Sequence, residues 1–454
     1  MSESVLQLYQ QTREQSVSFC APLEREDYSL QAEAFVSPPK WHLAHTTWFF
    51  ETFLLKRFDK NYRTPNDCYE VLFNSYYNGI GEQFPRPKRG LLSRPTVAQV
   101  LDYRLHVDRA MAALLADKSH PERDAIAART ILGVEHERQH QELFFTDIKY
   151  SLAINPMAPT YVDAPIIDDA KMVAPAWQHY AGGLQEMGFN GSGFCFDNEL
   201  PRHKSFVAAF ELSDRLVTNA EYQQFIDDGG YQRPELWLAD GWATVQAEAW
   251  RVPLYWLADA ENAMEYTLHG PRPRQAATPV THVSGYEADA YARWAGARLP
   301  TEFEWELAAA DAAAADAAAA DAAAADAAAA DAAAADAAAA DAAAAGDDKV
   351  VNGNSGGVDT GYYHPRPAAT GTGLKQLYGD CWQWTQSAYG PYPGYKPSPG
   401  AIGEYNGKFM SNQWVLRGGS CVSKAQQVRP SYRNFFYPQD RWQFSGIRLA
   451  RDPG

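Results

Sequence analysis

The chain changes character near residue 165, and this change constrains the fold more than any other feature of the sequence. Up to about residue 155, apolar residues recur at helical spacing, whereas the later part has short apolar runs separated by Gly, Pro and Asn. Eleven of the thirteen tryptophans also lie after residue 165. We therefore expect a multi-domain protein, with an all-α domain over residues 1–165 and an irregular α+β domain, held by aromatic packing, over residues 166–454.

Four helices are predicted in the first domain. The first opens near residue 5, and the second follows a cap at Ser37 and runs to Leu55. Thr96 and Gln99 have the spacing of a capping box for the third helix. The fourth covers about residues 121–154. Four helices with one long connection are typical of a four-helix bundle.

Three histidines form a candidate metal site in this bundle. His136 and His140 are four residues apart on the fourth helix, so their side chains lie on one face about one turn apart. Two imidazoles in this arrangement can hold one metal ion. His45 on the second helix is the candidate third ligand, and such a set leaves positions open for substrates and dioxygen. His42, one turn before His45, is expected to be a supporting residue or an ordinary hydrogen-bonded histidine.

Two other interpretations of these histidines are open from the residues alone. They could be ordinary core histidines, since short metal motifs also arise by chance. Residues 136–140 also satisfy the His-Glu-x-x-His pattern of zinc hydrolases, in which Glu137 would be the general base. No third ligand of that pattern follows downstream, and Glu137 is expected to be a solvated helix residue.

Composition excludes several classes of protein. The formal net charge is −16, and no basic stripe is present, so a nucleic-acid partner is not expected. No apolar stretch is long enough to span a bilayer, and the first residues do not resemble an export signal. The five cysteines are scattered and odd in number, which favours a reducing, cytoplasmic location over a disulfide framework.

An Ala/Asp repeat over residues 308–345 interrupts the second domain. It contains seven of the negative charges and would be helical by propensity. A five-residue period places these aspartates on no single helix face, so no fixed packing is implied. We interpret it as filler that replaces a surface loop and assign it no function; a solvated linker is the alternative.

The second domain resembles the formylglycine-generating-enzyme and sulfatase-modifying-factor family, which has a C-type-lectin-like fold. The resemblance rests on segments in family order, at residues 215–222, 279–284, 294–306, 379–385, 415–420 and 446–448. Helices are expected at about 219–227 and 285–295. The paired copper-binding cysteines of the formylglycine-generating oxidases are missing near residues 428–434, which argues against sulfatase maturation.

The first domain resembles DinB-like bundles, and the combination of both domains resembles the ergothioneine-biosynthesis sulfoxide synthases of the EgtB type (hercynine oxygenases). This resemblance covers the whole chain except the Ala/Asp repeat. It implies a non-haem iron(II) enzyme that uses dioxygen to join hercynine, the betaine of histidine, to a thiol at the imidazole C2 position. Residues 74–78, 89–96 and 432–436 are particularly close to the branch that uses cysteine.

The resemblance also implies roles for individual residues. His45, His136 and His140 match the iron ligands. Tyr76 and Tyr77 match paired tyrosines beside the iron, and Tyr77 is the stronger candidate for proton donation. The residues that match substrate contacts are Arg86 and Arg89 for the carboxylate of the thiol substrate and Gln139, Asn434, Phe435 and Phe436 for hercynine and its surroundings.

The identity of the sulfur donor depends on two positions. The branch that uses γ-glutamylcysteine has an aspartate where this chain has Phe436 and an arginine where it has Asp440, so free cysteine is favoured. A related synthase acting on histidine, as in ovothiol biosynthesis, or a selenium-using relative is an alternative. A lectin-like binding module without enzymatic activity is the alternative from another class.

Overall fold

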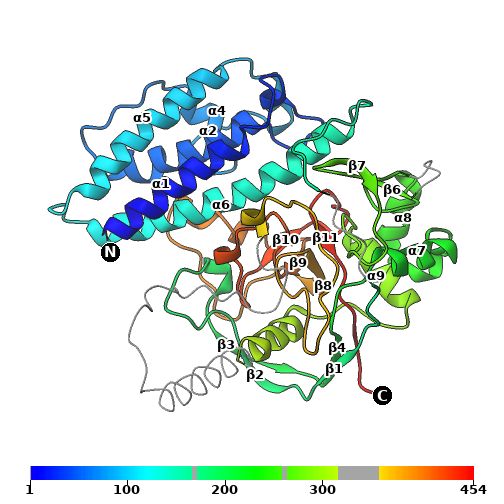
Figure 1. The fold of residues 1–454 in the computed structure, drawn as a ribbon. Helices are drawn as coiled ribbons and strands as arrows, with labels where there is room; N and C mark the ends of the chain where they lie inside the picture. Colours follow the sequence, from blue (N-terminus) through cyan, green and yellow to red (C-terminus); the bar gives the residue numbers. More distant parts are fainter. Residues whose placement is uncertain (1, 166–170, 258–262, 315–356) are drawn as a thin grey trace, which may run out of the picture.

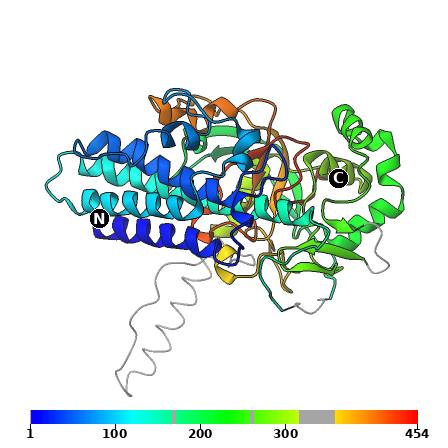
Figure 2. The same cartoon turned by 90° about the horizontal axis from the view of Figure 1, so that it is seen from above.

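The computed structural model describes residues 2–165, 171–257, 263–314 and 357–454. A helical bundle is followed by an α+β domain, which confirms the predicted fold class (Figure 1). The bundle helices are α1 (Ser2–Phe19), α2 (Pro39–Phe50), α5 (Val97–Ala116) and α6 (Arg123–Ala153). α1 packs on α6, and α2 packs on both α5 and α6, so the long helices run side by side (Figure 2).

The predicted cap of the second helix is wrong. The N-cap of α2 is Pro38, whose side chain has no hydrogen-bonding group that could cap the helix. Pro39 occupies the first turn, where the missing N–H has no hydrogen-bond partner to lose. Ser37 has another role, because its N–H donates to Asp147 at 2.7 Å and its hydroxyl accepts from Arg89 at 3.0 Å. It therefore ties the start of α2 to α6 and to the connection that follows α2.

The other predicted helix bounds hold closely. Thr96 and Gln99 form the capping box of α5, with bonds of 3.2 and 2.8 Å. α2 continues through a π-helical turn, η2 (Glu51–Leu55), into α3 (Lys56–Phe58). The connection before α5 contains α4 (Tyr69–Phe73) and the 3₁₀ helix η3 (Arg86–Leu91). No helix in the described part of the chain is both long and apolar enough to cross a membrane.

Four small sheets are found in the described part of the second domain. The largest has the order β10-β9-β8-β11 and consists of β8 (Trp382–Ala388), β9 (Trp414–Arg417), β10 (Asn434–Phe436) and β11 (Ser445–Gly446). A second sheet joins β1 (Trp177–Tyr180), β4 (Phe210–Ser213) and β12 (Ala450–Arg451). The others pair β2 (Gly183–Met187) with β3 (His203–Val207), and β5 (Trp256–Leu257), β6 (Met264–Thr267) and β7 (Gly270–Pro273). The strands are short, as the sequence pattern predicts.

Among the described residues of this domain, two helices stand where they were predicted, and two begin at positions that were not predicted as helix starts. α7 (Asn219–Asp227) has the predicted bounds, and α9 (Gly285–Trp294) ends one residue early. α8 (Ala239–Ala247) has no side-chain cap, so its start carries no sequence signal. Another helix begins at residue 302 and is described to residue 314. Most of the Ala/Asp repeat, residues 315–345, lies outside the described residues.

Helix α6 packs against α1 and α2 and, on its other side, bonds through Glu142 to Trp382 of β8 (Figure 1). Buried Glu142 of α6 accepts from Trp382 Nε1 at 2.6 Å, from Gln443 Nε2 at 2.9 Å and from the Ser423 hydroxyl. Breaking these hydrogen bonds would leave the buried carboxylate and its donors without partners, which costs free energy. The second domain is therefore fixed against the helix that carries His136 and His140.

Candidate functional site

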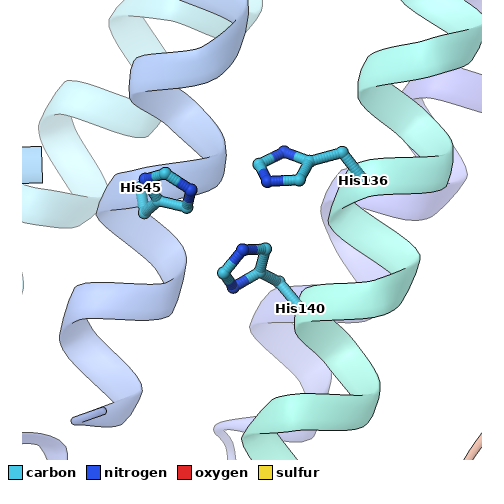
Figure 3. Close-up of side chains that lie close together, drawn as sticks. All are labelled: His45, His136 and His140. Carbon is cyan, nitrogen blue, oxygen red and sulfur yellow. The ribbon is translucent and has the colours of Figure 1, made fainter. Parts of the chain in front are cut away.

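The three predicted histidines meet between α2 and α6. His45 projects from α2, and His136 and His140 project from successive turns of α6 (Figure 3). One ligand nitrogen from each ring lies within 4.8 Å of the others. The ring centroids are 5.1 Å apart for His45 and His136, and 4.7 Å apart for each of the other two pairs. Residues 91 positions apart in the chain thus form one cluster.

The nitrogens of this cluster fit a divalent metal ion. His45 Nδ1 hydrogen-bonds to the carbonyl of Phe73 at 2.6 Å, which leaves its Nε2 without a partner, and neither nitrogen of His136 has a partner among the described residues. Buried polar atoms without partners are rare and call for an explanation. Burial lowers the pKa of His136 to about 3 and holds the pKa of His45 and of His140 well below the ordinary value. Neutral imidazoles with available lone pairs are good ligands for first-row metal ions.

His42 supports the cluster from outside. Its Nδ1 is 2.9 Å from His140 Nδ1, and its Nε2 is 3.1 Å from a carboxylate oxygen of Asp147. The consistent tautomers have His140 donating to His42 and His42 donating to Asp147. This arrangement keeps the Nε2 lone pair of His140 available and fixes the ring, as outer partners of metal-binding histidines do.

The expectation that Glu137 is solvated is wrong. Its side chain is 0% exposed and lies inside the bundle, where it accepts from Arg13 at 2.9 Å, from Ser16 at 2.6 Å and from Arg104. Burial alone would raise the pKa of Glu137, but Arg104 and Arg13 lower it to about 2. A carboxylate saturated by two guanidinium groups is a poor general base, which argues against the zinc hydrolase interpretation.

A cavity of about 460 Å³ opens beside His140, between the bundle and the second domain. From the bundle and its connection, Trp41, Tyr76, Arg86, Arg89 and Gln139 line it. From the second domain, Tyr405, Tyr432, Asn434, Phe435, Phe436, Asp440 and Trp442 line it. Its size suits small-molecule substrates, and clefts between domains are common binding sites.

The two neighbouring tyrosines, Tyr76 and Tyr77, lie at different distances from the cavity. Tyr76 lines the cavity, and Tyr77 stacks behind it with ring centroids 4.8 Å apart. Tyr77 contacts the ring of Trp48, which also contacts His45, with centroid distances of 5.6 Å in both cases. The buried hydroxyl of Tyr77 has no hydrogen-bond partner among the described residues. Burial raises the pKa of both tyrosines, so both phenols stay protonated near neutral pH.

Arg89 is a buried cation, and the described part of the chain gives it no counter-ion. It is 3% exposed, lies 3.4 Å above the ring of Trp41 and donates to the hydroxyls of Ser37 at 3.0 Å and Ser75 at 3.2 Å. No carboxylate of the described residues lies within ion-pair distance of it, and burial holds its pKa well below the ordinary value. Arg86, which is exposed, donates to the carbonyl of Phe35.

The remaining predicted residues all line the same cavity. Gln139 Nε2 donates to the hydroxyl of Tyr432 at 2.8 Å. Asn434 accepts from the N–H of Phe435 at 2.9 Å, and the ring of Phe435 stacks on that of Tyr389 with a centroid distance of 4.1 Å. Phe436 contacts Trp442, with centroids 5.5 Å apart.

Sequence reasoning missed Tyr405 and Tyr432. The Tyr405 ring lies 5.4 Å from that of His136 and 6.3 Å from that of Tyr76, measured between centroids. Tyr405 stands in an irregular loop between β8 and β9, where no periodic pattern marks it. Tyr432 stands two residues before Asn434, in a segment that resembles the family. Its position beside a predicted site residue could have identified it as a site residue.

Comparison with known proteins agrees with this architecture. The model of the sulfatase-modifying factor enzyme 1-like domain matches residues 168–453, and the model of the DinB superfamily matches residues 8–144. The chain is 31% identical over 441 residues to a hercynine oxygenase of Mycolicibacterium thermoresistibile, covering 93% of this chain and 89% of that protein. It is 30% identical over 440 residues to a hercynine oxygenase of Mycolicibacterium smegmatis, covering 93% and 92%.

A match to the second domain alone is also present. Over 284 residues the chain is 28% identical to the formylglycine-generating enzyme of Streptomyces coelicolor, covering 58% of this chain and 84% of that protein. A DinB-type bundle joined to a sulfatase-modifying-factor domain, with a histidine cluster beside the cavity between them, defines a class of two-domain enzymes. Within this class, the chain belongs to the hercynine oxygenase family.

Proposed function

We propose that this protein is an iron(II)- and dioxygen-dependent sulfoxide synthase that joins hercynine to L-cysteine, a step of ergothioneine biosynthesis. The observation that carries the proposal is the cluster of His45, His136 and His140, of which His140 lines a cavity of substrate size. The relatives that match over 93% of the chain carry the name hercynine oxygenase, which supports hercynine as one substrate.

The overall reaction balances with one dioxygen molecule. Hercynine loses the hydrogen on C2 and cysteine loses its thiol hydrogen as the C–S bond forms, a two-electron oxidation. Conversion of the sulfur to a sulfoxide removes two more electrons. Dioxygen accepts all four electrons; one oxygen atom enters the sulfoxide and the other leaves as water with the two hydrogens.

His45, His136 and His140 would hold the iron. Their unpartnered nitrogens converge, and His42 with Asp147 orients His140 from outside. When bound, iron(II) supplies the redox chemistry that activates dioxygen, which no side chain of the protein can supply. The protein's part is to hold both substrates beside that centre and to exclude water.

Arg89 and Arg86 would bind the carboxylate of cysteine. Arg89 is buried and has no counter-ion among the residues that the structure describes, so an incoming carboxylate would gain a charge-assisted, two-point contact. Trp41 stacks on the Arg89 guanidinium and fixes its plane. Trp41 also stacks on His45, with ring centroids 4.6 Å apart, so a single side chain contacts both Arg89 and one of the metal ligands.

Gln139, Asn434, Phe435 and Phe436 would surround hercynine. Its trimethylammonium group has no N–H to donate, so it is best held by aromatic faces and oxygen atoms. Phe435 and Phe436 offer such faces on β10, and Asn434 of the same strand offers an amide oxygen. The Tyr432 hydroxyl fixes the Gln139 amide by accepting from its Nε2.

Tyr77, with Tyr76 in front of it, would donate a proton or hydrogen bond during the coupling. Tyr77 contacts Phe49 with ring centroids 6.5 Å apart, and Phe49 contacts His136 with ring centroids 4.6 Å apart. One aromatic ring therefore separates the phenol from His136, and the ring of Trp48 separates it in the same way from His45. A protonated phenol near the centre can steer dioxygen chemistry toward C–S bond formation and away from simple oxidation of the thiol.

An aerobic assay with iron(II), hercynine and cysteine tests this function, with mass spectrometry for the coupled sulfoxide. We expect product with iron(II), none after its removal and none with zinc in its place. Product yield that is unchanged after complete removal of iron would refute the proposal. Competing histidine, γ-glutamylcysteine or a selenosugar in the same assay separates the related synthases, because the preferred pair gives the major product.

A further inference from the structure

Asn74 holds the turn at Tyr76 and Tyr77 from within its own domain. Its buried side chain donates from Nδ2 to the carbonyl of Tyr77 at 3.0 Å, and its Oδ1 accepts from the N–H of Tyr77 at 3.1 Å. The turn itself is tight, because the N–H of Asn78 donates to the carbonyl of Tyr76 at 3.0 Å. Both polar backbone groups of Tyr77 therefore have partners inside the connection that precedes α5.

A pair of charged residues from the second domain binds the other side of this turn. Glu404 Oε2 accepts from the N–H of Asn78 at 3.0 Å, and Glu404 Oε1 accepts from the N–H of Gly79 at 2.7 Å. Lys408 donates to the carbonyl of Tyr76 and, at 3.1 Å, to Glu404. This Glu404–Lys408 clamp joins the second domain to the backbone of the turn.

The clamp and Asn74 together hold both peptide groups that flank Tyr77. Lys408 bonds to the carbonyl of the preceding peptide group, and Glu404 bonds to the N–H of the following one. Asn74 bonds to the remaining N–H and carbonyl of these two groups. Because two planar peptide groups set the φ and ψ of the residue between them, they also set the direction of its side chain. The clamp therefore acts on the buried phenol of Tyr77 through the backbone.

The contact between Glu404 and the turn is close and charge-assisted. Burial alone would raise the pKa of Glu404, but the Gly79 N–H, Lys408 and the Asn78 N–H together lower it, so the carboxylate is ionised near neutral pH. Hydrogen bonds to an ionised acceptor are roughly twice as strong as those between neutral groups. A Cβ at position 79 would lie 2.9 Å from Glu404 Oε1, so the absence of a side chain there permits the approach.

The segment that carries the clamp also forms part of the cavity wall. Tyr405, Asn406 and Phe409 line the cavity between the domains, and the ring of Phe409 contacts that of Tyr76 with centroids 5.1 Å apart. The clamp itself is not among the residues that line the cavity. An effect of the clamp on the reaction would therefore pass through the turn and not through contact with the substrates.

We propose that Glu404 and Lys408 are positioning residues, which hold the backbone on both sides of Tyr77 so that its phenol keeps the orientation needed for the coupling step. The inference rests on the proposed function, in which Tyr77 donates a proton or hydrogen bond. Loss of the clamp should free the turn and leave the three histidines and the Arg89 site in place.

The partition between two products tests the effect of the clamp on the reaction. In the aerobic assay we expect Glu404→Ala to lower the ratio of coupled sulfoxide to oxidised cysteine by about 10–100-fold, as for a reacting group that is slightly misplaced. The KM of hercynine and of cysteine should change little. This ratio does not depend on how much of the variant is folded. Glu404→Gln, which keeps one acceptor oxygen, should recover part of the ratio.

Glu82→Ala is the matched control, because Glu82 is an exposed glutamate of the same connection whose carboxylate forms no hydrogen bond among the described residues. Its product ratio should equal that of the wild type. A wild-type ratio in Glu404→Ala, or the same fall in Glu82→Ala, would overturn the positioning role.

Amide hydrogen exchange, measured by mass spectrometry on peptides that span residues 74–84, tests the same contact without the reaction. Glu404 is the acceptor of the Gly79 N–H in the described structure, so Glu404→Ala should speed exchange in these peptides and leave α6 unchanged. Unchanged exchange would overturn the inference. If the wild type forms no coupled sulfoxide, the proposed function fails, and faster exchange in Glu404→Ala still assigns the clamp to the turn.

Discussion

Gly133 of α6 packs directly against Phe50 of α2. A Cβ at position 133 would lie 2.5 Å from Cε1 of Phe50 and 3.1 Å from Cε1 of Phe49. Phe49 in turn contacts the ring of His136, which stands one turn after Gly133. The absence of a side chain at this position therefore sets how closely the helix with His45 approaches the helix with the other two histidines.

Gly133→Ala should separate α2 from α6. The added methyl group must displace two buried aromatic rings, and such overpacking costs about 1–3 kcal/mol in the free energy of unfolding. Metal affinity should fall as well, because the ligands come from both helices. Thermal unfolding and competition with a chelator measure the two effects. Gly193→Ala is the control, since a Cβ there meets nothing within 4 Å; equal behaviour of the two variants would contradict the role of Gly133.

Removal of the outer partner of His140 should weaken the metal site without removing a ligand. We expect His42→Ala to lower metal affinity by about 10–100-fold, as for other outer partners of metal-binding histidines. Chelator competition with the purified protein gives the affinity directly. His106→Ala, whose ring lies at the surface and bonds only to the carbonyl of Arg63 among the described residues, serves as the control. An unchanged affinity in His42→Ala would show that His140 is held by packing alone.

The ligands on α6 could be predicted because a spacing of four residues fixes their common face, whereas His45 was a candidate from another helix whose packing against α6 the sequence leaves undetermined. Glu137 could not be placed, since its partners Arg13 and Arg104 come from two other helices whose rotation a periodic pattern leaves undetermined. The same limit applies to Tyr405, which reaches His136 from a loop whose path depends on the packing of β8 and β9. The spacing of residues along the chain predicts which side chains share a helix face. Contacts between distant segments can be assigned only when the packing of the core is known.

Glu137 should stabilise the bundle and should not act as a base. Replacement with Gln leaves Arg104 buried without its anion and leaves Arg13 with Asp108 alone, and loss of a partner from a buried ion pair costs about 3–5 kcal/mol. Because the folded pKa of about 2 lies below the ordinary glutamate value of about 4.5, this stability is complete above about pH 4.5 and is lost as the pH falls toward 2. Denaturant unfolding at pH 7 and pH 3 should therefore show a smaller difference between wild type and Glu137→Gln at pH 3. An equal difference at both pH values would contradict this linkage.

Tyr77→Phe tests whether the buried phenol directs the reaction. The ring packs against Trp48 and Phe53, and Phe preserves that packing, so the stability of the protein should change little. We expect coupled sulfoxide to fall by about 10²–10⁴-fold, the usual contribution of a positioned proton donor, while oxidation of cysteine alone increases. Mass spectrometry of both products in one reaction gives the ratio. Tyr76→Phe is the comparison: a larger shift of the ratio in that variant would assign the proton donor to the cavity wall and not to Tyr77.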